Sequence, residues 1–423
     1  MSSITKIIST YRPDLGPYED LYKYYHTHPE LSFQEKETAA SIVAHLKKLN
    51  AYEIHAGIGG HGVAAVMHNG EGKKLLLRAD IDGLPVEERT GLEYASTRKM
   101  VDGDGVEKSV MHACGHDMHI TSLLAAAETL VKAKDEWTGT LILIFQPAEE
   151  RAAGAMAMIK DGLYKKVPEP DLCIGAHVMP YRSGVIGTKH GLMASAADSF
   201  HLTITGRQAH ASTPNKSIDP IVLASSTILR LQTIVSREVD PSDFAVVTVS
   251  AIHAGDAENI IPEKAEVKLN VRSAVPATRD RVLSSIRRII EAEAVASNAP
   301  EMPVLKETTS FPFLFNDAVV TTALESSFSS HFAVSKTEYS ADIMRLAGSE
   351  DFGILATSIG KPSCFFLYGG IEGEYWDRME KEGRLDEVPG NHSPFFAPAI
   401  QPTLSRGVDG YVIGALTFLG KGE

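Results

Sequence analysis

Short runs of consecutive apolar residues alternate with helical patterns along most of the chain. Strands that are buried on both faces of a sheet have such continuous runs. Four of them occur, at residues 74–81 (KLLLRADI), 140–145 (TLILIF), 171–176 (DLCIGA) and 363–370 (SCFFLYGG). Between them, residues 120–134 and 152–163 carry apolar positions at helical spacing, and the second stretch is long enough to join two parallel strands. This alternation predicts an α/β domain with a mostly parallel sheet and helices on both faces.

The pattern changes between residues 194 and 309. Polar and apolar residues alternate there as in half-buried strands, and two long helical patterns interrupt them. The elements follow the order strand, helix, strand, strand, helix, strand, at residues 199–206, 218–237, 244–254, 265–273, 278–297 and 302–309. This is the order of a ferredoxin-like α+β unit. We therefore predict an inserted domain at 194–309, within a larger domain formed by residues 1–193 and 310–423.

Local signals refine the N-terminal part of the larger domain. Ser32 and Glu35 have the spacing of a capping box before the helix that apolar positions at 39–49 predict. Asn69-Gly70 is a turn signal between a predicted strand at 62–68 and the first long apolar run.

Composition excludes several classes of protein. The 423 residues are 43% hydrophobic and 22% charged, which is an ordinary globular composition with enough apolar residues for a large core. Asp and Glu outnumber Lys and Arg by 54 to 41, and the net charge of −13 argues against nucleic acid or an anionic membrane as a partner. The N-terminus lacks the apolar core of a secretory signal, and no apolar run reaches the roughly 18 residues of a membrane span. Three scattered cysteines form no disulfide framework, so we expect a cytoplasmic protein.

The segment MHACGHDMH concentrates side chains that bind metals. His112, Cys114, His116 and His119 lie within nine residues there. In an extended segment Cys114 and His116 would point the same way, and Gly115 would let the backbone bend around an ion. A helix would instead align the three histidines and turn Cys114 away. The alternative is a loop at the start of a helix whose histidines are only polar. We interpret the segment as part of a metal site.

Further donors follow the buried strands. Asp82 comes after the first strand, Glu149 and Glu150 after the second, and His177 after the third. The carboxyl ends of parallel strands meet at one rim of an open α/β sheet, so these side chains are expected to converge. His392 lies in a loop after the fourth strand and is the last candidate.

Five donors are too many for one tetrahedral structural zinc. The set Cys114, His116, Glu150, His177 and His392 suits two divalent ions that share a ligand and keep open positions for water or substrate. Zn, Mn, Co and Ni all accept such ligands, so the identity of the metal stays open. No Ser-His-Asp nucleophile and no phosphate-binding glycine loop competes with this interpretation.

The chemistry of the site follows from its carboxylates. Neighbouring side chains at a strand end diverge, so one of Glu149 and Glu150 should bind metal while the other takes a proton from the bound water as general base. Asp82 is interpreted as a carboxylate that accepts a ring N–H and fixes the tautomer of a metal-bound histidine, here His116. His26 precedes a helix rather than following a strand, and we expect it to be structural.

Together these segments resemble the metal-dependent amidohydrolases that include aminoacylases, hippurate hydrolases and plant auxin-conjugate hydrolases, in the peptidase M20 superfamily. The resemblance runs almost end to end, in HPELSFQE, LRADIDGLP, MHACGHDMH, FQPAEE, GAHV, ITGRQAHASTP, GDAENIIPEKAEVKLNVR, GSEDFG and NHSPFF. It implies that Cys114 bridges the two ions, that Glu150 is a ligand and that Glu149 is the base.

The resemblance also implies that the inserted domain is a lid whose His210, Asn259 and Arg272 reach toward the substrate. In dimeric relatives such residues can come from the partner subunit, and a homodimer through the lid is expected. His210 or Asn259 would donate to a developing oxyanion, and Arg272 would hold a substrate carboxylate. Alternatively, Arg272 is only a solvent-facing residue of its alternating strand.

The predicted function is hydrolysis of the amide bond of a small N-acyl amino acid or a related conjugate. Residues 96–110 are longer and more polar than in the family pattern, and residues 372–389 form a long charged segment before His392. Both are expected to border the substrate entrance. A dipeptidase or aminopeptidase on the same site is an alternative, since the sequence does not show whether an acidic anchor for a free amine lines the pocket. The motifs are also compatible with a biosynthetic enzyme that forms or releases an amide, or with a binding protein that keeps a vestigial site. The intact Glu149 argues against the vestigial site.

Overall fold

The computed structural model describes residues 3–332, 339–346 and 348–421, and the chain divides into two compact units. The first unit consists of Met1–Met193, Phe315–Arg345 and Asp351–Glu423, and the second of Ala194–Leu314 and Leu346–Glu350. The second unit extends beyond residue 309, because the last strand of its sheet, β15 (Val304–Phe311), continues past that position.

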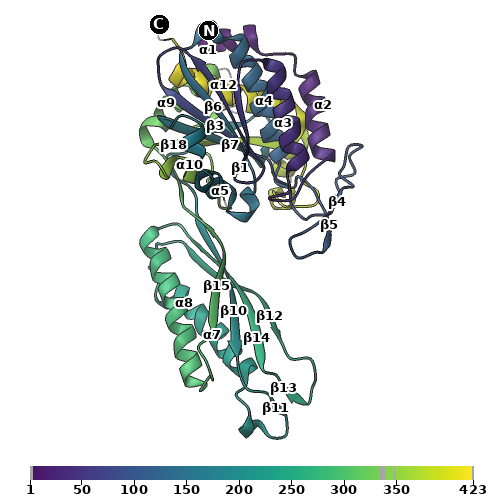
Figure 1. Cartoon of the computed structure of the whole chain (residues 1–423), viewed down its shortest axis with the longest axis vertical. Helices are drawn as coiled ribbons and strands as arrows, with labels where there is room; N and C mark the ends of the chain where they lie inside the picture. Colours follow the sequence, from purple (N-terminus) through teal and green to yellow (C-terminus); the bar gives the residue numbers. More distant parts are fainter. Residues whose placement is uncertain (1–2, 333–338, 347, 422–423) are drawn as a thin grey trace. The chain divides into compact units, whose positions relative to one another are not determined.

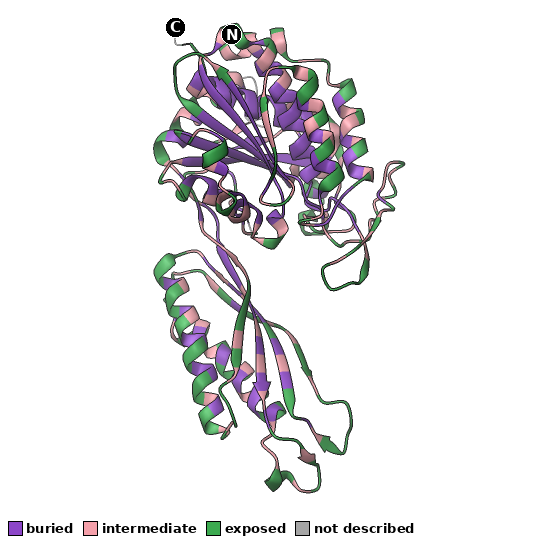
Figure 2. Ribbon diagram, viewed as in Figure 1, coloured by how far each residue is buried: buried purple, intermediate pink, exposed green. Residues whose placement is uncertain are grey.

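An eight-stranded sheet forms the centre of the first unit (Figure 1). Its strands lie in the order β1 (Glu53–Ile58), β2 (Gly62–Asn69), β6 (Gly139–Gln146), β3 (Lys74–Asp80), β7 (Leu172–Arg182), β18 (Ser363–Ile371), β8 (Ile186–Gly187) and β17 (Tyr339–Ser340). The four central strands, β6, β3, β7 and β18, are parallel and correspond to the four apolar runs of the sequence. Almost all of their residues are buried, as Figure 2 shows.

Helices cover both faces of this sheet, which explains the continuous burial of its strands. On one face α4 (His116–Lys132) packs beside α12 (Ile400–Leu419), and Ile174 of β7 lies against Gly414 of α12. On the other face the next residue, Gly175, faces the ring of Phe352, which precedes α10 (Gly353–Thr357). The predicted fold class of this domain is therefore confirmed. Its remaining α-helices are α1 (Ser3–Tyr11), α2 (Gly16–Thr27), α3 (Lys36–Leu49), α5 (Gly154–Lys160), α6 (Leu163–Lys166), α9 (Ala318–His331) and α11 (Gly373–Lys381).

Two local predictions were wrong, and a third was confirmed. Helix α4 begins at His116, four residues before the predicted start at 120. Strand β7 continues to Arg182, so His177 lies within the strand rather than after it. The predicted turn at Asn69-Gly70 is present, with a φ of +84° at Gly70, and it leads from β2 to β3 although β6 lies between these two strands in the sheet.

The second unit is a four-stranded antiparallel sheet with two helices on one face. Its strands lie in the order β12 (Ala245–Ala254), β14 (Lys264–Ser273), β10 (Ala196–Thr205) and β15. Apolar side chains of α7 (Pro220–Arg237) and α8 (Pro276–Ala296) join those of the strands in one core. The strand-helix-strand-strand-helix-strand order is the ferredoxin-like arrangement expected from the sequence.

Among the described residues, no helix combines the length and the apolar character needed to cross a bilayer.

Candidate metal centre

The segment that contains Cys114 forms a tight turn followed directly by a helix. The Gly115 amide donates to the carbonyl of His112 (3.0 Å), and Gly115 takes a φ of +85° as the residue that precedes α4. Cys114 therefore lies in the turn and His116 in the first turn of the helix. Neither the extended segment nor the continuous helix considered from the sequence is right, because Gly115 reverses the chain between the two donors.

Gly115 is required by space as well as by its backbone angle. A Cβ at this position would lie 2.4 Å from Cγ1 of Val178. We expect Gly115→Ala to lower the free energy of unfolding by about 2–3 kcal/mol, through left-handed backbone strain and the clash, as measured by urea denaturation. Gly105→Ala is the control, because Gly105 has a φ of +78° but nothing within 4 Å of an added methyl group. Equal destabilisation by the two variants would show that the contact with Val178 has no energetic weight.

Asp82 holds several parts of the site together. Its carboxylate accepts hydrogen bonds from the Ser32 hydroxyl (2.6 Å) and from the backbone amides of Glu149 (3.2 Å) and Glu150 (3.1 Å). The same carboxylate lies 3.2 Å from Nδ1 of His116. One buried group thus orients the imidazole and fixes the short 3-10 helix η2 (Glu149–Arg151) that presents both glutamates.

These contacts explain why the predicted capping box does not form. The hydroxyl of Ser32 is used by Asp82 rather than by the start of α3. Glu35 accepts hydrogen bonds from the amides of Phe33 (2.8 Å) and Ala148 (2.9 Å), so it supports the loop before η2. Side chains whose spacing suggested a helix cap serve the site instead.

The structure brings the five predicted ligands together. Cys114 Sγ lies 3.4 Å from His177 Nε2, and Glu150 Oε1 lies 3.8 Å from His116 Nε2 and 3.4 Å from His392 Nε2. Donor atoms of Cys114, Glu150 and His392 all lie within 4.8 Å of one another. Segments as far apart in the chain as residues 114 and 392 thus meet at one rim of the sheet.

Both glutamates lie close to the helix-borne histidine. Donor atoms of Glu149, Glu150 and His116 lie within 4.8 Å of one another, but only Glu150 also joins Cys114 and His392. Glu149 is 5% exposed. The two neighbouring carboxylates therefore have different surroundings, as the sequence argument required.

The position of His392 depends on an unusual backbone conformation. His392 has a φ of +70°, its amide donates to the carbonyl of Ala113 (2.8 Å), and its side chain is 55% exposed. The Asn391 amide group donates to the carbonyls of Cys114 (3.1 Å) and Val178 (3.3 Å). These bonds attach the loop to the turn that carries Cys114 and leave His392 on the open side of the site.

The site has an excess of negative potential. Burial and the nearby carboxylates of Glu150 and Glu149 raise the pKa of the Cys114 thiol well above its ordinary value. Burial alone would lower the pKa of His116, but Asp80 and Asp82 raise it to about 10. A divalent cation would replace these protons, since a thiol that coordinates a metal is deprotonated.

His177 is arranged as a neutral ligand. Burial and the neighbouring His119 hold its pKa well below the ordinary value. Its Nδ1 lies 2.7 Å from the carbonyl oxygen of Val178. Because a carbonyl only accepts, Nδ1 carries the hydrogen, and the lone pair of Nε2 faces Cys114.

Two orphaned atoms support metal binding. His116 Nε2 and Glu150 Oε1 are buried and have no hydrogen-bond partner among the residues that the structure describes. Buried polar atoms are costly unless they are satisfied, and these two face each other. Thiolate, imidazole and carboxylate donors fit zinc, manganese, cobalt or nickel.

Asp80 and His119 form a layer behind the ligands that the sequence argument did not assign. Asp80 lies 2.5 Å from Nδ1 of His119 and 3.6 Å from Nε2 of His116. His119 Nε2 accepts from the amide of Val178 (2.8 Å), so both of its ring nitrogens are in use and it is not available as a ligand. His119 was visible in the dense motif, but only the tertiary structure distinguishes it from His116.

A buried arginine completes this layer. Arg78 donates to Asp80 (2.7 Å) and to Gln146 (2.9 Å), and it lies 3.5 Å from Asp351. Burial would raise the pKa of Asp80, but Arg78 and the two histidines hold it well below its ordinary value. The sequence feature that could have indicated this buried ion pair is the presence of Arg78 and Asp80 within the apolar run KLLLRADI.

His26 lies outside the metal cluster. It is buried between Asp117 (2.6 Å) and Glu88 (2.9 Å), as suits a structural residue. Burial opposes its charge, but the two carboxylates raise its pKa to about 9.

A cavity of about 440 Å³ adjoins Glu150. One wall carries Asp102 and Asp104, at the tip of the hairpin of β4 (Lys99–Val101) and β5 (Glu107–Ser109). Arg151 and apolar residues, among them Leu84, line other parts of it. The polar stretch that departs from the family pattern thus borders a cavity that contains a candidate ligand.

The three lid candidates lie in the second unit but not in one place. His210 of β11 (Ala209–His210) pairs with Ile260 of β13 (Ile260–Ile261), and the Asn259 carbonyl accepts from Ala211 (2.9 Å). Both lie near the end of the sheet where β14 begins, as Figure 1 shows for this unit.

Arg272 lies near the other end of the same strand. It pairs with Ala197, close to where the chain enters the unit. A ten-residue strand is roughly 30 Å long, so Arg272 and His210 of one chain lie too far apart to contact the same small substrate.

Comparisons with known proteins identify the family. The sequence model of Peptidase family M20/M25/M40 matches residues 76–381, which is well over half of the chain. The chain belongs to this family. The M20 resemblance inferred from the motifs is thereby confirmed.

Characterised relatives of this M20 protein are named hydrolases. Hippurate hydrolase of Campylobacter jejuni is 40% identical over 80% of this chain and 84% of its own length. N-acetylcysteine deacetylase of Bacillus subtilis is 35% identical over 83% of this chain and 87% of its own length. A Bacillus subtilis crystal structure described as a dinuclear metal binding peptidase of family M20 matches 95% of this chain and 98% of its own, with a TM-score of 0.73 and 29% identity. The prediction that the chain is an amidohydrolase is confirmed at the level of the family.

Proposed function

We propose that this M20 protein hydrolyses the amide bond of N-acyl amino acids or related conjugates. The observation that carries the proposal is the convergence of Cys114, His116, Glu150, His177 and His392 with Glu149 beside them. The names of the relatives agree with it, because hippurate and N-acetylcysteine are both N-acylated amino acids.

Different residues of the site bind the metal ions and transfer the proton. Glu150 lies close to His116 and His392, and Cys114 lies close to His177. These five side chains would hold two divalent ions. The bound ions would supply a water of lowered pKa and a polarised amide carbonyl. Glu149 takes a proton from the attacking water and delivers it to the amide nitrogen. A C–O bond forms as the C–N bond breaks, and the products are a carboxylic acid and an amine.

We further propose that the second unit acts as a lid and that the active enzyme is a homodimer. Arg272 would hold a substrate carboxylate, and His210 and Asn259 would donate to the carbonyl oxygen. The length of β14 supports a contribution from two chains, because Arg272 and His210 of one chain lie at opposite ends of it. The edge strand β12 is open to pairing and exposes Val246 and Ile252.

A dipeptidase or aminopeptidase activity is the second candidate. Asp102 and Asp104 line the cavity beside Glu150 and would attract a free amine. Arg151 lines the same cavity, and its positive charge would repel a free amine.

The test compares substrates on metal-loaded and chelator-treated protein. We expect N-benzoyl and N-acetyl amino acids to be cleaved only with metal, faster than dipeptides with a free amine. Arg272→Ala should raise KM about tenfold for acyl amino acids with a free carboxylate and leave their carboxamides unchanged. Cleavage of dipeptides alone would favour the second candidate, and an equal effect of the variant on carboxamides would reject the clamp.

A further inference from the structure

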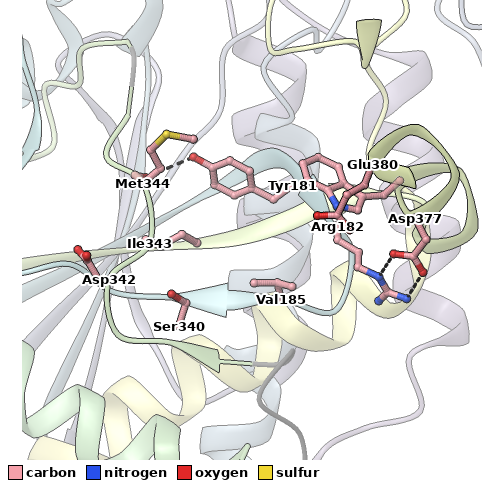
Figure 3. A pocket seen from close by; sticks show the side chains of 10 residues that line it. Tyr181, Arg182, Val185, Ser340, Asp342, Ile343, Met344, Asp377 and Glu380 are labelled. Atoms are coloured by element: carbon pink, nitrogen blue, oxygen red, sulfur yellow. Dashed lines mark hydrogen bonds and ion pairs between the residues drawn. The ribbon is translucent and has the colours of Figure 1, made fainter. Parts of the chain in front are cut away.

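A second cavity of about 610 Å³ lies in the first unit, apart from the candidate metal centre. Three segments form it: the end of β7 with the turn into β8, the stretch from Ser340 to Met344, and one side of α11. Figure 3 shows their side chains around it. None of the candidate metal ligands lines this cavity, and Trp376, Asp377 and Glu380 of its wall belong to the 372–389 segment that was expected to border the substrate entrance. The volume of the cavity is in the range of small-molecule sites.

Aromatic and apolar side chains form much of the wall. Tyr181 and Trp376 contribute rings, and Ile343 and Met344 contribute aliphatic surface. The Tyr181 hydroxyl donates to the carbonyl of Met344 (3.3 Å), which connects β7 to the neighbouring segment (Figure 3). Aromatic faces and a thioether favour an apolar body or a cation.

The charged groups of the wall leave one carboxylate available. Arg182 donates to Asp377 through Nε (2.7 Å) and Nη2 (2.9 Å), and Asp342 lies 2.5 Å from Nζ of Lys189. Glu380 forms no ion pair within 4 Å of any residue in the described part of the chain, and its charge acts on the Arg182 guanidinium only from a greater distance. An anionic ligand would meet a guanidinium that is already paired, whereas an ammonium group would meet Glu380.

We propose that this cavity binds an organic cation, a protonated amine on an aromatic or apolar body. The ammonium group is recognised by Glu380, and the body lies against Trp376 and Tyr181. The substrates proposed for the metal centre carry a carboxylate, so this site differs from the active site in ligand charge, and it shares none of the candidate metal ligands. The inference does not depend on the proposed hydrolysis.

Intrinsic fluorescence provides a direct test on the full-length protein. The chain has two tryptophans, and Trp137 is 1% exposed in the core, whereas Trp376 lines the cavity. We expect phenethylammonium to change the fluorescence in a saturable manner. Phenethyl alcohol should bind at least about threefold more weakly, and 3-phenylpropionate should produce no saturable change. Trp376→Phe should abolish the response while calorimetry still detects binding.

Variants of one helix separate charge from shape. Glu380→Gln should weaken phenethylammonium binding about two- to fivefold, in the range of a partly exposed ion pair. Glu374→Gln, on the same helix but outside the cavity, is the matched control and should leave the affinity unchanged.

The comparison of ligands uses the parent protein, so it remains valid even if a variant fails to fold. Equal affinity for the amine and the alcohol would overturn the proposal, and so would equal affinities of the two glutamine variants. Phenethylammonium should bind the metal-loaded and the chelator-treated protein equally, which separates this outcome from failure of the proposed function.

Discussion

Glu149→Gln is expected to lower kcat by about 10²–10⁴-fold while the protein keeps its bound metal. The side chain is buried, and its carboxylate lies within 4.8 Å of donor atoms of His116 and Glu150. Glutamine preserves its volume but cannot accept the proton of the attacking water. Steady-state kinetics on an N-acyl amino acid, together with metal analysis of the same sample, measure both quantities.

Two further variants show whether a loss of activity in Glu149→Gln comes from the missing base or from lost metal. Glu150→Gln should lose metal as well as activity, because Glu150 Oε1 is the orphaned atom between His116 and His392. Glu87→Gln, at an exposed side chain, should change neither. A Glu149→Gln protein as active as the parent would reject the assignment of the base, and one that also lost its metal would make Glu149 a ligand.

Arg78→Met should lower the free energy of unfolding by about 3–5 kcal/mol. The guanidinium is fully buried, and its loss leaves the buried carboxylate of Asp80 without its closest cation. Removing one partner of a buried ion pair is far more costly than removing an exposed one. Urea denaturation of the metal-free protein measures the effect without a contribution from bound ions.

The control for this prediction is an exposed pair. Arg89 lies 3.1 Å from Glu87, and both side chains are more than 60% exposed. Arg89→Met should therefore change the free energy of unfolding by less than about 0.5 kcal/mol. A comparable loss in both variants would show that the layer behind the ligands is not a stabilising element.

The sequence was most informative where burial is continuous. Runs such as KLLLRADI predicted the central parallel strands, because consecutive apolar residues in a short segment are typical of a strand covered on both faces. The rule that ligands bind at the carboxyl ends of such strands then placed the glutamates near the MHACGHDMH segment. This rule can be applied without knowing the conformation of the loops.

Details that depend on tertiary partners could not be predicted. The start of α4 was missed, because the polar residues HDMH are buried there, with partners from distant segments such as His26 of α2 and Asp80 of β3. The roles of Arg78 and His119 follow from contacts with Asp80 and Val178 that no local pattern specifies. His392 needed a left-handed backbone, which its spacing does not reveal.

The lid residues illustrate a different limit. Asn259 precedes the strand predicted at 265–273, and Arg272 lies near its end, so the two residues are separated by almost the whole strand. The resemblance nevertheless implied that both contact the same substrate. The lengths of the elements in the second unit place Arg272 and Asn259 of one chain too far apart to contact one small substrate together.

The central claim is that one cluster of donors holds two cations. Anomalous diffraction from crystals of the metal-loaded protein, combined with metal analysis in solution, tests it most directly. Two ions per chain are predicted, bound at about 2.0–2.3 Å by Cys114, His116, Glu150, His177 and His392, with Glu149 unbound to either ion. A single ion, no ion, or ions bound by Asp80 and His119 in place of Cys114 and Glu150 would contradict the account.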